Sequence, residues 1–439
     1  PPRSTLFPYT TLFRSERKLT GHLFLCIFVF GVSIYGNPTI EQLIGLITMY
    51  LKDFSISRPG LHLRINEEAV NFFEQILSLS IQLAIPEKLK LSIPNQFSRI
   101  LIVDSTGIEL PEELAEFFRG NEGSASTAGI KIQFYYDLKV SKWFYLIKSA
   151  VSPDTSMGSD IVNEAKVGDM ILQDLGYFNV ETFNNLNQKG AYYLSRLKTD
   201  VTFYIKNEFE ELVPLDLVNF AKYLAYNGIE QTELSGFVRS KHNTFTPVRL
   251  VVEKLPDAVV NQRLRRLNKE AQHKHRQVSY RSRILASVNL YITNAPVELL
   301  PAQYCRKLYS IRWQIELIFK AWKSHFLLNK LRGQSIERIK VTLFAKLIFI
   351  TLASKIVQLT TSSLWFSNRR EVSYFRAIGY LQIIAEKWFE NLLSHSTTSV
   401  FGLLKHAVYF IKEHCFKIPQ TDRVYPLEFL ENFSFHILT

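Results

Sequence analysis

The sequence predicts an α/β protein with helical regions at both ends, and three observations support this prediction. Short apolar runs between residues 97 and 175, two of which end in an aspartate, are typical of buried strands. Residues 190–296 contain several further runs with strand-like composition. Residues 16–96 and 331–439 are rich in apolar side chains at the three- and four-residue spacing that indicates helices.

The composition limits the class of partner and the compartment. The 439 residues carry a formal net charge of +12, which favours an acidic partner such as nucleic acid, although many basic proteins bind none. The three cysteines, Cys26, Cys305 and Cys415, are far apart and lack metal-ligand spacing, which fits a reducing cytoplasm. The longest apolar run, Leu23 to Tyr35, is shorter than the about 20 residues of a membrane helix, so we expect a buried helix rather than an anchor or a signal peptide.

The first fifteen residues differ in character from the rest of the chain. They lack an initiator methionine and any helical or strand periodicity, and Thr5 to Ser15 resembles the conceptual translation of a common sequencing adapter. We therefore interpret residues 1–15 as an artefact fused to a truncated gene. Within residues 16–96, Thr39 with Gln42 predicts a helix cap. The helices on either side of Ser57-Arg-Pro-Gly are compatible with a DNA-binding helix-turn-helix and equally with a plain helical subdomain.

Two aspartates are predicted at the carboxyl ends of buried strands. Arg99-Ile-Leu-Ile-Val-Asp104 and Asp169-Met-Ile-Leu-Gln-Asp174 have the same pattern, with two more strands expected between them at Lys131–Tyr136 and Trp143–Ile147. Strand ends at the edge of an open sheet are where α/β folds place their sites. The alternative for either aspartate alone is a helix cap or a turn residue.

The segment from 190 to 296 is predicted to be β-rich and carries one strongly basic run. Strands are expected at Tyr192–Leu197, Val201–Ile205, Val248–Glu253 and Leu290–Thr293. Arg263 to Arg283 contains eight Lys or Arg residues and one acid, Glu270. This run is either a DNA-facing helix and loop or a solvated face, and taken alone it favours the solvated face.

A long helix is predicted from Pro301 through about Leu328. At about 100° per residue, four polar side chains fall within a stripe of about 60° beside an apolar arc: Tyr309, Arg312, Glu316 and Lys323. An acid flanked by bases can hold a metal ion while the bases contact DNA phosphates. The alternative is an ordinary amphipathic helix with an Arg312–Glu316 ion pair.

These motifs together resemble those of one transposase family. Tyr309-x2-Arg312-x3-Glu316-x6-Lys323 is similar to the YREK signature of insertion-sequence-four transposases. ILIVDST around Asp104 and DMILQDLGYF around Asp174 resemble the first two acid motifs of that family. RKLTGHLFL, TIEQL and LYITNAP extend the resemblance over about residues 17–330.

The resemblance implies a ribonuclease H-like catalytic domain at residues 97–330, with a β insertion at about 190–296. It implies an N-terminal DNA-binding region at 16–96 and a helical C-terminal region at 331–439 that can serve dimerisation. The implied activity is DDE transposition, in which the enzyme excises an insertion sequence and joins it to target DNA with two Mg²⁺ ions, for which Mn²⁺ can substitute. The implied metal ligands are Asp104, Asp174 and Glu316, and the implied DNA contacts are Tyr309, Arg312 and Lys323.

The resemblance also indicates the partners, and the sequence departs from the family pattern at one position. The expected partners are double-stranded DNA, as transposon end and as target, and a second copy of the chain. Val288 stands where relatives commonly carry a base-stacking tryptophan, so either another aromatic residue such as Tyr291 substitutes for it or hairpin handling is weakened. Two other functions stay open, a metal-dependent nuclease without strand transfer and an inactive DNA-binding relic. If the assignment is correct, the three carboxylates lie within roughly 8 Å of one another.

Overall fold

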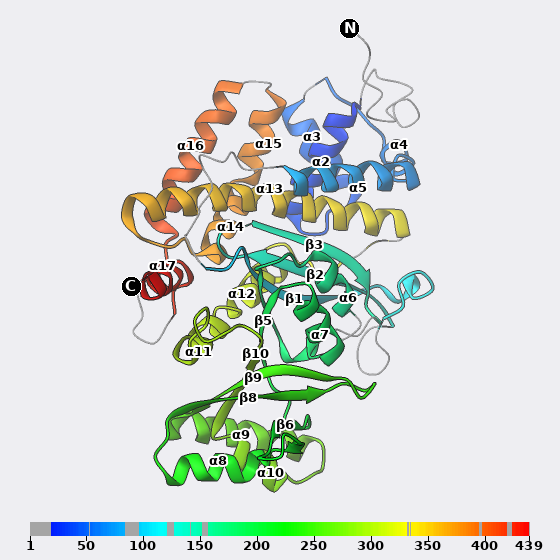
Figure 1. Cartoon of the computed structure of the whole chain (residues 1–439). Coiled ribbons are helices and arrows are strands. Elements are labelled where there is room, and N and C mark those ends of the chain that lie inside the picture. The colour runs from blue at the N-terminus through cyan, green and yellow to red at the C-terminus, as the bar shows by residue number, and fades with distance from the viewer. Residues whose placement is uncertain are drawn as a thin grey trace.

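The computed structural model describes most of the chain. The described residues are 19–51, 53–83, 96–120, 127–140, 142–151, 157–331, 333, 335–394, 397–418 and 424–438. The predicted adapter-derived segment, residues 1–15, lies outside this range. A single ten-stranded sheet runs through the molecule, with helices on both of its faces (Figure 1).

The sheet has the strand order β3-β2-β1-β4-β5-β10-β9-β8-β6-β7. Five strands form the catalytic half: β1 (Ile100–Leu110), β2 (Ala128–Asp137), β3 (Lys142–Ser149), β4 (Met170–Gln173) and β5 (Tyr192–Arg196). Three antiparallel strands, β3, β2 and β1, are followed by β4 and β5, which run parallel to β1. With its flanking helices this arrangement is consistent with the predicted ribonuclease H-like core.

The two faces of this half bury alternate residues of the same strands, as the period of two in a strand requires. On one face, Leu101 and Val103 of β1 pack with Phe183 and other apolar side chains of α6 (Gly158–Glu164) and α7 (Val180–Gln188). On the other face, Ile100 and Ile102 pack against helices from both ends of the chain. The near-continuous apolar run before Asp104 is therefore explained by burial on both faces.

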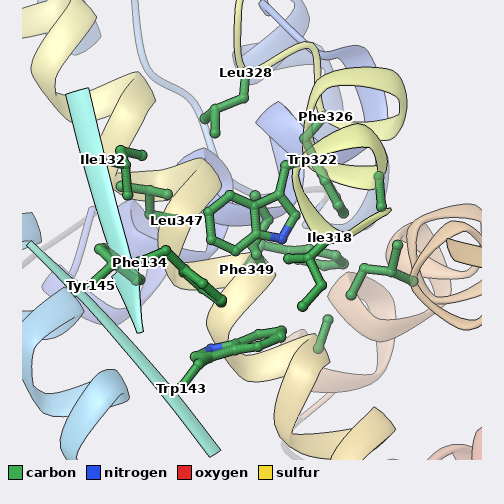
Figure 2. Packing of buried hydrophobic residues seen from close by; sticks show 14 of the residues in the cluster. Ile132, Phe134, Trp143, Tyr145, Ile318, Trp322, Phe326, Leu328, Leu347 and Phe349 are labelled. Carbon is green, nitrogen blue, oxygen red and sulfur yellow. The ribbon is translucent and has the colours of Figure 1, made fainter. Parts of the chain in front are cut away.

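The second face centres on Trp322 of α12 (Trp313–His325), which is fully buried. Its ring centroid lies 5.3 Å from that of Phe134 and 6.1 Å from that of Trp143. Its indole N–H donates to the Tyr374 hydroxyl at 3.0 Å, so the polar group is satisfied inside the core. Figure 2 shows these rings together with Ile318 of the same helix. This packing fixes α12 against the sheet.

The predicted β insertion continues the core sheet. Its strands are β6 (Phe203–Lys206), β7 (Leu212–Pro214), β8 (Gln231–Arg239), β9 (Phe245–Lys254) and β10 (Val288–Thr293), and its helices are α8 (Leu217–Tyr226), α9 (Asp257–His273) and α10 (Tyr280–Leu285). Since β10 pairs with both β5 and β9, the insertion is joined to the catalytic half by backbone hydrogen bonds. The three helices lie together beyond β8 and β9 (Figure 1).

Among its described residues, the N-terminal region forms four helices: α2 (Gly21–Tyr35), α3 (Ile40–Tyr50), α4 (Arg58–His62) and α5 (Glu67–Gln82). The predicted capping box at Thr39 and Gln42 is confirmed, with both reciprocal hydrogen bonds present. Ser57-Arg-Pro-Gly does not simply interrupt the helices, because Ser57 caps the short α4. The apolar faces of α2 and α5 are buried in the same core as α13.

The C-terminal region is helical as predicted. It comprises α13 (Ile336–Asn368), α14 (Tyr374–Ile383), α15 (Ala385–Leu393), α16 (Thr397–His414) and α17 (Pro426–Leu438). Within the described chain, α13 is long and apolar enough to cross a membrane, and α2 with α3 also passes that test as a pair bent by 111°. However, 89% of the apolar window of α13 is buried inside the protein. Helix α13 is thus a core helix that runs past both the N-terminal and C-terminal helices (Figure 1).

The prediction of one continuous helix from Pro301 through about Leu328 is wrong. The segment forms two helices, α11 (Ala302–Ser310) and α12, separated by a turn at Ile311 and Arg312. In this turn the backbone hydrogen bonds tighten to a three-residue spacing, with Ile311 N–H donating to Leu308 and Arg312 N–H donating to Tyr309. The break places Arg312 at the cap position of α12.

Candidate active site

The first two acids are brought together by the register of β1 and β4. The parallel pairing ends at Val103 opposite Gln173. Asp104 and Asp174 each follow the last residue of this parallel pairing, so they emerge side by side. Strand β1 continues to Leu110 by pairing with β2, so Asp104 is not at its carboxyl end as predicted. It lies instead where the parallel part of the pairing stops.

The side-chain contacts of the two aspartates differ from those of helix-capping residues. Asp174 precedes the 3-10 helix η4 (Leu175–Tyr177), but its side chain makes no capping hydrogen bond. Asp104 accepts one backbone hydrogen bond, from the Ser105 N–H at 2.8 Å. Their side chains are 43% and 17% exposed, so both reach the surface of the protein.

The third acid comes from α12. Glu316 lies in the first turn of the helix and its side chain is 33% exposed. The apolar side chains on the same helix, including Ile315, Ile318 and Trp322, are buried. The amphipathic pattern therefore places Glu316 at the rim of the core, as the sequence predicts.

Arg312 joins the three acids. Its Nη1 lies 2.8 Å from Asp104 Oδ2, and its Nη2 lies 2.8 Å from Glu316 Oε1 and 3.5 Å from Asp174 Oδ1. The guanidinium is only 13% exposed. The ion pair between Arg312 and Glu316 that an ordinary amphipathic helix would form is thus present, but it is one part of a four-residue cluster from three elements.

Burial and charge set the protonation of this cluster. Burial is the largest cause that raises the pKa of Asp104, from 3.8 to about 6. The Arg312 guanidinium and the Ser105 N–H lower this pKa, while the negative charges of Asp174 and Glu316 raise it. The site therefore concentrates negative charge that a cation can balance, and in this conformation that cation is the Arg312 guanidinium.

The three carboxylates are chemically suited to bind a divalent cation, but in this conformation they bind the Arg312 guanidinium. Carboxylate oxygens are the ligands that Mg²⁺ and Mn²⁺ prefer. Within the described part of the chain, no group of three or more His, Cys, Asp or Glu side chains is positioned to hold a metal ion. Arg312 accounts for this, because it lies between the carboxylates. A bound cation would have to take its place.

Tyr309 lies beside the cluster but is not exposed to a ligand in this conformation. Its hydroxyl oxygen is buried without a hydrogen-bond partner among the described residues, and burial raises the pKa of Tyr309 to about 12. The ring lies 5.4 Å from the ring of Tyr291 and 5.9 Å from the Arg312 guanidinium, centre to centre. The structure thus places Tyr309 beside the acids but keeps its hydroxyl group buried.

Lys323 is the predicted site residue that the structure does not bring to the acids. It lies seven residues after Glu316, roughly 10 Å further along α12. Burial lowers the pKa of Lys323, and the charge of Glu109 on β1 opposes this effect. Lys323 therefore flanks the site along the helix.

The two positions considered for base stacking are both buried. Val288 and Tyr291 are 3% and 4% exposed, and Tyr291 packs on Tyr309. The replacement of the missing tryptophan by Tyr291 therefore stays a prediction, and it would require a rearrangement that exposes the Tyr291 ring. Trp313, which was not predicted as a site residue, is 55% exposed and lies between Arg312 and Glu316 in the chain. The sequence did contain a signal for Trp313, because this large aromatic residue lies outside the apolar arc of the predicted helix.

A second missed feature supports the geometry from the opposite end of the strands. Asp169, directly before β4, is fully buried and pairs with Arg99, directly before β1, at 2.5 Å. Asp169 also accepts the Lys166 N–H at 2.7 Å, and Arg99 donates to the Glu164 carbonyl at 2.9 Å. This pair fixes β1 and β4 in the register that aligns Asp104 with Asp174.

Comparisons with known proteins agree with this architecture. A family model described as "Transposase DDE domain" matches residues 95–352. The chain is 34% identical over 341 residues to the transposase of insertion sequence element IS231F from Bacillus thuringiensis subsp. israelensis, covering 74% of this chain and 71% of that protein. It is 30% identical over 387 residues to the transposase of IS231E from subsp. finitimus, covering 85% and 80%. It is 29% identical over 384 residues to the transposase of IS1151 from Clostridium perfringens, covering 83% and 80%. The chain therefore belongs to the DDE transposases of the insertion-sequence-four family.

Proposed function

We propose that this protein excises an insertion sequence and joins it to target DNA, using metal ions held by Asp104, Asp174 and Glu316. One observation carries the proposal. Three carboxylates from β1, the end of β4 and α12 gather around a single cationic group at the surface of the protein. Structural ion pairs rarely need three acids for one base, whereas a polynucleotidyl transferase needs several carboxylates for its cations.

Mg²⁺ is the proposed ion, with Mn²⁺ as a substitute, because both accept carboxylate oxygens. When bound, a pair of such ions activates a water or a DNA 3′-hydroxyl as nucleophile and stabilises the leaving 3′ oxygen. Asp104, Asp174 and Glu316 would hold the ions. Asp104 must lose its proton to do so, and its pKa of about 6 leaves it ionised at neutral pH.

The flanking residues are proposed to position DNA. Arg312 lies beside the acids and Lys323 flanks the site further along α12, and both would contact DNA phosphates. Tyr309 would support the Arg312 side chain and reach a phosphate only after a local rearrangement, because its hydroxyl is buried. A nucleophilic role for Tyr309 is disfavoured, since its pKa of about 12 keeps the hydroxyl protonated. Trp313 is the exposed aromatic residue beside the acids that can stack on a base.

The basic run on α9, the following loop and α10 is proposed as a further DNA-contacting surface. Seven of its eight Lys and Arg residues are exposed, and Arg263 alone is half-buried. Arg263 donates to Asn289 on β10, so the run is anchored to the sheet that carries the acids. We further propose that the protein acts as a homodimer on DNA in the cytoplasm, with the helical C-terminal region in the dimer contact.

A strand-transfer assay tests the proposal. The purified protein is incubated with Mg²⁺, a labelled duplex that carries the transposon end, and a target plasmid. The proposal predicts cleavage at the end followed by covalent joining to the plasmid. Cleavage without joining would indicate the nuclease alternative, and DNA binding without cleavage would indicate the inactive relic. Glu298→Gln, an exposed carboxylate variant after β10, serves as the control that should retain activity.

A further inference from the structure

The Arg312 guanidinium occupies the position that the proposed metal ions require. It contacts two of the three carboxylates at 2.8 Å and the third at 3.5 Å. We infer that Arg312 is an exchangeable counter-ion, which holds the three acids together in the metal-free enzyme and moves to a DNA phosphate when the metal ions enter. This inference rests on the proposed function and adds to it that metal binding and DNA binding are coupled through one side chain.

The charges of the site favour such an exchange. Three carboxylates around one guanidinium keep an excess of negative charge, so the metal-free cluster is held together but is not neutral. Two divalent cations would more than neutralise the same carboxylates, and Arg312 would then face positive charge at contact distance. A phosphate is a ligand well suited to a displaced guanidinium, because the planar guanidinium can donate two parallel hydrogen bonds to two oxygens of the negatively charged phosphate.

The position of Arg312 in the fold allows it to move. It stands in the turn between α11 and α12 rather than inside a continuous helix, so the side chain extends from the end of a rigid element. Asp174 and Glu316, on which one side of the guanidinium rests, are 43% and 33% exposed, whereas Asp104 is 17% exposed. The cluster is therefore open on the Asp174 and Glu316 side, and the guanidinium can leave in that direction.

The hydrogen bonding of the guanidinium is incomplete in the position it now holds. Its Nε is buried and has no acceptor among the described residues, although both terminal nitrogens are paired. A phosphate has enough acceptor oxygens to accept from Nε as well as from a terminal nitrogen. After the exchange, the metal ions would bind the three carboxylates and the phosphate would accept hydrogen bonds from Arg312. The hydrogen bonding of the guanidinium would then be more complete than it is now.

The experiment measures Mn²⁺ binding, by the electron paramagnetic resonance signal of free Mn²⁺, without and with a catalytically blocked duplex that carries the transposon end. In the wild-type protein, DNA should increase Mn²⁺ affinity by about tenfold, and Mn²⁺ should increase DNA affinity by the same factor, because coupling is reciprocal. In the absence of DNA, Arg312→Gln should bind Mn²⁺ about tenfold more tightly than wild type does. The coupling factor, by which DNA increases the affinity for Mn²⁺, should fall correspondingly in this variant.

Two variants separate exchange from a general effect of charge. Arg312→Lys keeps the positive charge but cannot bridge the acids as a fork, so it should also bind Mn²⁺ more tightly than wild type. Arg306→Gln removes an arginine of α11 that pairs with Glu253 away from the cluster, and it should change neither Mn²⁺ affinity nor coupling.

The outcomes distinguish this inference from the proposed function. If wild type binds Mn²⁺ and end DNA, but Arg312→Gln gains no Mn²⁺ affinity or keeps the full coupling, then the exchange is refuted while the metal site stands. Wild-type behaviour of Arg312→Lys together with a gain in Arg312→Gln would show that a positive charge is sufficient without the forked guanidinium, and would refute the bridging of the acids by Arg312. Absence of Mn²⁺ binding by wild type would overturn the proposed function itself.

Discussion

The buried ion pair between Arg99 and Asp169 makes a quantitative prediction about stability. Asp169 is fully buried, and both of its carboxylate oxygens accept hydrogen bonds from Arg99, at 2.5 to 3.2 Å. The substitution Asp169→Ala leaves Arg99 with the Glu164 carbonyl as its remaining partner. Removal of one partner of a buried pair costs about 3–5 kcal/mol, and since Arg99 is 23% exposed we expect about 3 kcal/mol.

A loss of this size is large compared with the roughly 5–15 kcal/mol of a typical domain. Urea denaturation followed by tryptophan fluorescence should show it as a lower midpoint. The control is Asp160→Ala, which removes the Lys148–Asp160 pair at 3.1 Å, whose side chains are 35% and 23% exposed. That variant should lose at most about 1 kcal/mol. Equal stabilities for the two variants would refute the view that the buried pair secures β1 against β4.

The pair between Arg99 and Asp169 should also affect activity. Asp169 lies at the opposite end of β4 from Asp174, and it contacts no residue of the acid cluster among its hydrogen bonds to described residues. A shift of β4 against β1 would misalign Asp104 and Asp174. Asp169→Ala should therefore slow cleavage while DNA binding is retained, and cleavage at the wild-type rate would show that the register does not depend on this pair.

Three further predictions follow from the site and the core. Alanine at any of the three acids should abolish Mg²⁺-dependent cleavage and spare DNA binding, as measured by gel cleavage and filter binding: Asp104, Asp174 and Glu316. Lys323→Ala should weaken binding to transposon ends and lower the slope of log affinity against log salt by about one unit, and an unchanged slope would exclude a phosphate contact. Lys346 is fully buried on α13, and burial lowers its pKa from 10.5 to about 7, so between these pH values the unfolded chain holds a proton that the folded protein lacks. The free energy of unfolding of wild type should therefore rise with pH relative to Lys346→Met by roughly 1.4 kcal/mol per pH unit, and parallel pH profiles of the two proteins would contradict this pKa.

The main elements of the fold were predictable because their signals are local. Two-sided burial of β1 and β4 produces short continuous apolar runs, and capping by Thr39 produces a recognisable pair of residues. The β character of the insertion and the helical character of both end regions were likewise predicted from periodicity and composition.

The remaining features depend on contacts between segments that are distant in sequence. Strand β1 continues past Asp104 because β2 pairs with it as far as Leu110, which a run of residues around the aspartate does not indicate. The pairing of Asp169 with Arg99 joins positions 70 residues apart. The turn at Arg312 lies within a pattern that is helical on both sides, so periodicity alone predicted one helix.

The central claim is that Asp104, Asp174 and Glu316 hold catalytic metal ions. Crystals of the protein bound to transposon-end DNA, grown with Mn²⁺ at a concentration that supports cleavage, would test it directly by anomalous diffraction. The account predicts two manganese peaks about 4 Å apart among the three carboxylates, with the Arg312 side chain withdrawn from them. Manganese bound elsewhere, with the Arg312 guanidinium still between the carboxylates, would contradict it.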